Sequence, residues 1–237
     1  MLQNIKSFYG KRLIAIDGEI GHVLNLYFDD QTWAIRYVIA DAGSWLSERQ
    51  VLLSPHAFGD SHQAKEHLHV NLTRKQIENS PSIDLHKPVS RQYEEEYYRY
   101  YGWPAYWQGD GLWGTSAIPI LPLSSGPSSG KTAAANHSTT KRADVHLRST
   151  QAINGYQIEA SDGTIGNVCD FIMDARSWAI THLVVQTGSW LSDQEVELPT
   201  STIDHISYDE STVFVNSSRA AITHSPEHEL DLVYSAI

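Results

Sequence analysis

Asp17-Gly18-Glu19-Ile20-Gly21-His22-Val23 recurs 145 residues later as Asp162-Gly163-Thr164-Ile165-Gly166-Asn167-Val168. The same offset relates residues 8–85 to residues 153–230 without a gap, and 25 of the 78 aligned pairs are identical. Composition alone would give about five identities over that length. The chain of 237 residues therefore contains one unit written twice.

Each copy predicts about five short β-strands and one short helix. In the first copy, strands are expected at residues 23–28, 33–39, 51–53 and 67–71, which are rich in β-branched and aromatic side chains. Thr73 and Ser218 suit helix N-caps. Short antiparallel strands bury one face well by curling into a barrel, so we expect an all-β protein of two small barrels.

Several residues of the repeat suit structural roles. An Asp-Gly pair favours a tight turn, and a glycine kept within a strand indicates a bulge or a close backbone approach. Residues 43–47, Gly-Ser-Trp-Leu-Ser, return unchanged at 188–192, and we interpret them as a plug at one end of each barrel. The expected structural residues are Asp17, Gly18, Gly21, Gly43, Trp45, Asp162, Gly163, Gly166, Gly188 and Trp190.

The segment between the copies begins with an aromatic helix. Its Glu-rich start and the Gly102-Trp103-Pro104 stop predict about three helical turns from residue 90. The aromatics either pack on the barrels or form a surface for a partner. The residues we expect to bind a partner are Tyr93, Tyr97, Tyr100, Trp103, Tyr106 and Trp107.

These features divide the chain into four parts. The expected parts are a first barrel at 1–87, an aromatic helical insert at 88–114, a flexible Ser/Gly/Pro/Ala linker at 115–150 and a second barrel at 151–237.

Charge and cysteine content limit the classes of partner and the cellular locations that we expect. Net charge is −11, and residues 151–237 hold 2 Lys+Arg against 13 Asp+Glu. A surface this acidic disfavours the binding of nucleic acid. It is either an ordinary solvated surface or a docking surface for a basic partner. Cys169 is the single cysteine, and the sequence has neither a signal-peptide core nor an apolar run of membrane-spanning length. We expect a cytoplasmic protein without a transmembrane span.

The Asp-Gly-x-Ile-Gly turn, the Gly-x-Trp-Leu loop, the Val-x-Leu strand and the capped terminal helix together resemble the PRC-barrel family. This barrel forms the cytoplasmic domain of the photosynthetic reaction-centre H subunit and half of a bacterial ribosome maturation factor. The resemblance covers residues 8–85 and 153–230. It implies a bacterial protein-docking module without chemistry or cofactor.

Catalytic motifs do not stand out. His67 and His69 share a strand face, and a metal site would need a third ligand such as His62, Asp60 or Glu66. We interpret these histidines as surface residues and expect no metal, cofactor or enzymatic activity. The predicted function is a protein-binding or self-associating adaptor or scaffold. The alternatives are a peripheral subunit of a membrane or reaction-centre-like complex and a ribosome or RNA-processing accessory factor.

Overall fold

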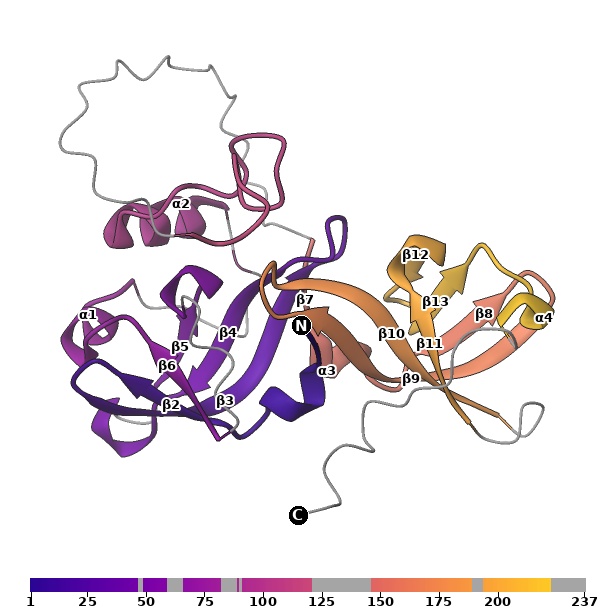
Figure 1. The fold of residues 1–237 in the computed structure, drawn as a ribbon, viewed down its shortest axis with the longest axis horizontal. Helices are drawn as coiled ribbons and strands as arrows, with labels where there is room; N and C mark the ends of the chain where they lie inside the picture. The colour runs from indigo at the N-terminus through magenta and orange to yellow at the C-terminus, as the bar shows by residue number, and fades with distance from the viewer. Residues whose placement is uncertain are drawn as a thin grey trace.

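A computed structural model describes residues 1–46, 49–58, 66–81, 89, 91–120, 146–188 and 194–222. Its strands form two sheets that lie side by side, the first in indigo and purple and the second in orange and yellow (Figure 1). The chain is mostly β, as the strand pattern predicts.

The first sheet has the strand order β5-β4-β3-β2-β6. Its strands are β2 (Arg12–Ala15), β3 (Gly18–Asp29), β4 (Ile35–Asp41), β5 (Gln50–Leu53) and β6 (His67–Val70). β2 pairs with β6 in parallel and with β3 in antiparallel fashion. Leu68 and Val70 are buried while His69 is exposed, which confirms the predicted alternation on β6.

The second sheet has the order β11-β10-β9-β8-β13-β12. Its strands are β8 (Gln157–Ala160), β9 (Gly163–Asp174), β10 (Ala179–Thr187), β11 (Glu195–Pro199), β12 (Ile203–Ser207) and β13 (Thr212–Val215). β8 pairs with β13 in parallel, as β2 does with β6. The sequence pattern did not predict β12.

Helices are few and short. The α-helices are α1 (Arg74–Glu78), α2 (Arg91–Tyr101), α3 (Thr150–Ile153) and α4 (Arg219–Ile222). Tight 3-10 turns occupy Ile5–Phe8, Gly43–Leu46, Pro55–Ala57 and Thr200–Thr202. Thr73 caps α1 through a capping box with Gln76, and the Ser218 hydroxyl accepts a bond from Ala221 N, so both predicted caps are confirmed.

Neither sheet closes on itself among the described strands. β5 and β6 are the two edges of the first order, and β11 and β12 are the two edges of the second. The expected closed barrels are therefore not formed by these strands. The physical reason lies in the burial: apolar side chains of both halves belong to one continuous core, so each sheet is covered without closing.

The two halves exchange one short strand each. β1 (Leu2–Asn4) pairs with β9 of the second sheet, and β7 (Leu147–Ser149) pairs with β3 of the first. Leu2 lies opposite Asp174, and Leu147 lies opposite Asp29. Leu2 and Leu147 are 145 residues apart, as are Asp29 and Asp174, so the two pairings are equivalent under the sequence repeat. The prediction of a flexible linker through residue 150 is wrong for β7, because pairing with a distant strand orders it.

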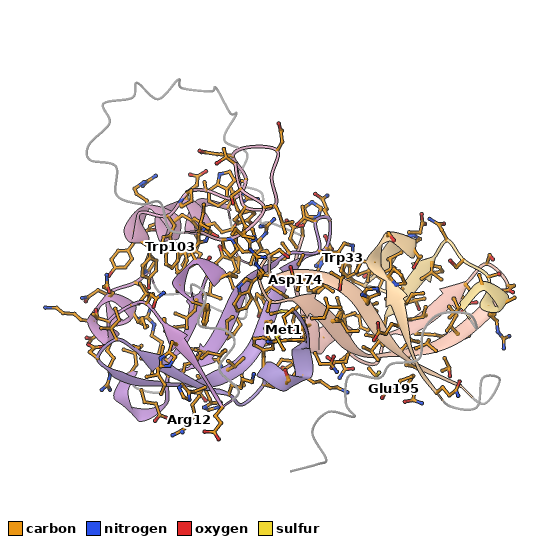
Figure 2. The ribbon with its side chains drawn as sticks, in the orientation of Figure 1. Met1, Arg12, Trp33, Trp103, Asp174 and Glu195 are labelled. Carbon is orange, nitrogen blue, oxygen red and sulfur yellow. The ribbon has the colours of Figure 1, made fainter. Side chains whose placement is uncertain are left out.

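A second reciprocal contact joins β4 to β10 at their first residues. Ala34 and Ala179 form an antiparallel bridge. Ile35 N donates to Trp178 O at 2.8 Å, and Ile180 N donates to Trp33 O at 2.7 Å. Trp33 marks this junction in Figure 2, beside Met1 and Asp174. These contacts have the form of an approximate two-fold axis between the halves.

The repeated turn residues make the same contacts in both halves. A Cβ on Gly21 would lie 1.8 Å from Asp41 O, and one on Gly166 would lie 2.0 Å from Gln186 O. Both sites therefore need glycine, as the predicted close approach requires. Gly18 and Gly163 turn the chain with φ of +143° and +129°.

The two repeated aspartates cap the terminal helices. Asp17 Oδ1 accepts from Arg74 N at 2.7 Å, and Asp162 Oδ1 accepts from Arg219 N at the same distance. Gly43 has a φ of +60°, and Gly188 N donates to Ile165 O. The Trp45 side chain and Trp190, predicted to plug the barrels, lie outside the described residues.

Candidate functional site

Helix α2 lies over the first sheet, with the loop that follows it above the junction of the halves (Figure 1). Its residue Tyr97 is buried, and the hydroxyl donates to Leu52 O at 2.8 Å and accepts from Ser54 N at 3.2 Å. The Tyr97 ring also meets Tyr37 edge-on at 5.7 Å. The helix is therefore fixed to the end of β5 and to β4 by one side chain.

A buried carboxylate forms the centre of this contact. Glu94 is 0% exposed, and its Oε1 accepts from Tyr37 at 2.7 Å and from Tyr106 at 2.8 Å. Arg91 Nη1 lies 2.9 Å from the other oxygen. Burial and then the neighbouring Glu94 charge raise the pKa of Tyr37 well above its ordinary value, so Tyr37 stays a hydrogen-bond donor.

A buried arginine connects β4 to the loop after α2. Arg36 is 2% exposed, and its guanidinium lies 3.8 Å from the Tyr106 ring centre and 5.0 Å from that of Trp113. Its Nη1 donates to Leu112 O at 2.6 Å, and Nη2 donates to Thr32 Oγ1 at 3.0 Å. The two aromatic faces and the oxygens of Leu112 and Thr32 thereby stabilise the buried positive charge of the arginine.

The same loop reaches the second half. Trp113 is buried, and its indole Nε1 donates to Ser177 O at 2.7 Å in the turn between β9 and β10. The insert therefore contacts both sheets, and Arg36 and Trp113 form a continuous path between them.

A serine–histidine contact lies under the aromatic layer. Ser54 Oγ is 3.1 Å from His56 Nδ1, and the His56 ring stacks on Trp103 at 5.7 Å. Burial, and secondarily the charge of Arg36, lowers the pKa of His56 to about 4. Both residues are fully buried, so a substrate could reach Ser54 only if α2 were displaced. The arrangement serves packing between the sheet and the insert.

The structure places the six predicted partner-binding residues in three environments. Tyr97, Trp103 and Tyr106 are buried in this chain's own core. Tyr93 and Trp107 are half-buried, and the Tyr93 hydroxyl donates to Pro81 O. Tyr100 is 41% exposed, and its hydroxyl donates to Gln76 O at 2.9 Å. Three of the six are thus committed to the fold, among them Trp103, which follows the end of α2 and is labelled in Figure 2.

Sequence reasoning missed the polar residues that hold this layer. Arg36, Tyr37, His56 and Glu94 are all buried. The second copy offered a signal, because the positions equivalent to Arg36, Tyr37 and His56 hold Thr181 and His182 in β10 and Ser201 in the turn after β11. The difference in residue type at these three positions indicates a cover over the first half that the described part of the second half does not have.

The outer face of α2 remains in solvent. Its exposed residues are Glu95, Glu96, Arg99 and Tyr100. Two carboxylates, a guanidinium and an aromatic ring are therefore presented on a helix whose inner face is locked by Glu94 and Tyr97. A helix held this way can bind a partner without first being ordered.

Two histidines on β6 have their ring nitrogens close together. His67 Nε2 and His69 Nε2 are 3.1 Å apart on β6. The additional ligand candidates His62 and Asp60 lie outside the described residues. In the described part of the chain, no three His, Cys, Asp or Glu side chains come close enough together to hold a metal.

No protein-family model and no curated protein sequence matches this chain. The resemblance to the PRC-barrel rests on the chain's own motifs and stays a prediction. Within the described residues, no helix is long and apolar enough to cross a membrane.

Proposed function

We propose that this chain is a non-enzymatic, cytoplasmic adaptor built from two PRC-type units, and that the outer face of α2 binds a protein partner with a basic surface. The observation that carries the proposal is the division of α2 into a locked inner face and an open outer face. Glu94 and Tyr97 fix the helix to β4 and β5, while Tyr100 and two glutamates face solvent.

Charge selects the class of partner. The excess negative charge of the chain lies in residues 151–237, so the local charges of α2 decide. On its exposed face Glu95 and Glu96 outnumber Arg99 and add negative potential beside Tyr100. Complementary charge steers association and disfavours acidic partners. An exposed tyrosine beside these charges suits a contact that excludes water.

The buried polar groups support a structural role. Arg36, His56 and Glu94 have hydrogen-bonding or aromatic neighbours from the insert and the first sheet. These groups hold the helix in place, which is the task an adaptor requires of its core. Their burial under α2 leaves them away from solvent.

The test is a tagged pull-down from the source cell, with bound proteins identified by mass spectrometry. The variant Glu95→Lys/Glu96→Lys/Tyr100→Ala changes only exposed side chains of α2. A matched charge reversal, Asp209→Lys/Glu210→Lys, lies in an exposed turn of the second half. We expect a basic partner to be lost from the α2 variant and kept by the control.

Other results would redirect the proposal. If both folded variants keep the same partner, the α2 face is not the binding surface. Recovery of membrane-complex subunits, with sedimentation of the chain on membranes, would favour the reaction-centre-like alternative. Co-sedimentation with small ribosomal subunits would favour the ribosome-factor alternative.

A further inference from the structure

We propose that His67 and His69 form a bidentate site for a late divalent transition-metal ion of the Cu(II) class. The pair lies on β6, an edge strand of the first sheet, on a surface separate from α2. The two Nε2 atoms share a hydrogen bond of 3.1 Å, and the ring planes are inclined at 83°. A bound ion would take the place of the shared proton. The inference does not depend on the adaptor function.

The nitrogen separation fits two cis ligands of one ion. With a metal–nitrogen distance of about 2.0–2.1 Å, nitrogens 3.1 Å apart subtend an angle of about 98° at the metal. Over that range of distances the angle runs from about 95° to about 102° and lies between a right angle and a tetrahedral one, so the order of affinities, not the angle, selects the ion. Tetragonal nitrogen and oxygen shells suit Cu(II) and Ni(II), and the general order of affinities places Cu(II) first.

The strand holds both ligands in place before any ion arrives. Alternate residues of a strand point to the same face, so His67 and His69 project together. Between and beyond them, Leu68 and Val70 are buried and fix the strand to the core. Ligands whose backbone is held by packing lose little freedom on binding.

The charges next to His67 and His69 affect how strongly the pair binds a cation. Arg12 lies opposite His67 in the register and Ile14 lies opposite His69. Arg12 is exposed and its Nη1 is 3.9 Å from Glu19 Oε2, which offsets its repulsion of a cation. With two protein ligands in the described structure, water completes the coordination, and binding is reversible.

The second half provides a natural contrast. On β13 the equivalent positions of the repeat are Thr212 and Phe214, which have no imidazole. Phe214 instead stacks on His205 at 4.6 Å. The same strand position therefore offers a metal site in only one of the two halves.

The experiment titrates the full chain with Cu(II) and follows its binding by calorimetry and by the paramagnetic broadening of backbone amide signals in NMR spectra. We compare the wild type with His67→Gln and His69→Gln. The matched control is His22→Gln, an exposed histidine on β3, which β2 separates from β6. All three substituted positions lie outside the core, so we expect the variants to fold. Circular dichroism checks the fold of each variant.

We expect broadening of the wild-type spectrum centred on β6, and a loss of affinity of at least tenfold in each of the two pair variants. The control should bind as the wild type does. Acidification should release the ion, because ligating imidazoles must be neutral. Unchanged binding in His67→Gln or His69→Gln, or broadening centred on another histidine such as His205 or His146, would overturn the proposal.

Discussion

Strands β4 and β10 occupy equivalent places in the two halves but differ in how they are covered. Residues 35–40 of β4 are all buried, whereas in the first part of β10 the residues Ala179, Thr181 and His182 are half-buried. The insert explains the difference, because α2 and its loop cover the outer face of β4 through Tyr37 and Arg36. A strand that is buried on one face becomes buried on both faces when a helix packs over its outer face.

Polar residues changed along with the cover. Arg36 and Tyr37 of β4 correspond to Thr181 and His182 of β10. In the first half the polar groups reach inward-facing partners of the insert, while Thr181 donates to Ile172 O within its own sheet. The comparison teaches that one backbone can support a buried ionic layer or an ordinary sheet surface, depending on what packs over it.

The strongest way to break this contrast is Arg36→Ala. The change removes the guanidinium between Tyr106 and Trp113 and leaves Leu112 O without its donor. Removing one member of a buried ionic network costs about 3–5 kcal/mol of unfolding free energy. Urea unfolding followed by fluorescence measures this loss.

Thr181→Ala is the matched control at the equivalent position of β10. It removes two half-buried hydrogen bonds, one to Ile172 O and one to His182 Nδ1, and should cost about 1–2 kcal/mol. Similar losses in the two variants would show that the insert does not make β4 different from β10.

The pH dependence of stability tests the contrast at His56. Its pKa is lowered to about 4 in the folded chain, against an ordinary value near 6.5. The unfolded chain therefore binds a proton that the folded chain does not, and the free energy of unfolding falls as pH drops from about 6.5 to 4. The full difference would be about 3 kcal/mol, and above pH 6.5 this group has no effect.

Unfolding in urea at several pH values measures this effect. His56→Phe removes the titrating group and should flatten the curve over that window, whatever its effect on stability at neutral pH. The equivalent position in the second half is Ser201, which does not titrate. An equal slope in wild type and His56→Phe would mean that other groups cause the acid sensitivity.

Local patterns were predictable wherever neighbouring residues determine the structure. The Thr73 cap, the glycine needed at Gly21 and the alternation along β6 all follow from the sequence. Helix α2 ends at Tyr101, and Gly102 follows with a φ of +69°, as the Gly-Trp-Pro stop predicts. In each case the cause lies within a few residues of the effect.

Long-range pairing was not predictable in the same way. Strands β1 and β7 have three residues each, too few for a pattern of alternation, and their partners belong to the other half. The spacing of Tyr93, Tyr97 and Tyr100 on α2 predicts an apolar face but not what covers it. The structure shows that this chain's own sheet takes Tyr97, while Tyr100 stays exposed.

The finest test asks whether the two halves are equal where their residues are identical. Asp17 and Asp162 each cap the first backbone N–H of a short helix, at 2.7 Å in both cases. Changing either to alanine should cost about 1 kcal/mol, the typical value for a lost helix cap. The corresponding asparagine variants keep the acceptor oxygen and should lose less.

Hydrogen exchange at Arg74 N and Arg219 N reports each cap separately. We expect faster exchange at Arg74 in Asp17→Ala and at Arg219 in Asp162→Ala, with the other amide unaffected. Asp17 and Asp162 are both exposed and accept bonds of equal length, so their losses should match if the contact of Tyr100 with Gln76 O in α1 does not affect the cap. A clearly larger loss in the first half would mean that α2, through its contact with α1, makes the cap at Asp17 stronger than the cap at Asp162.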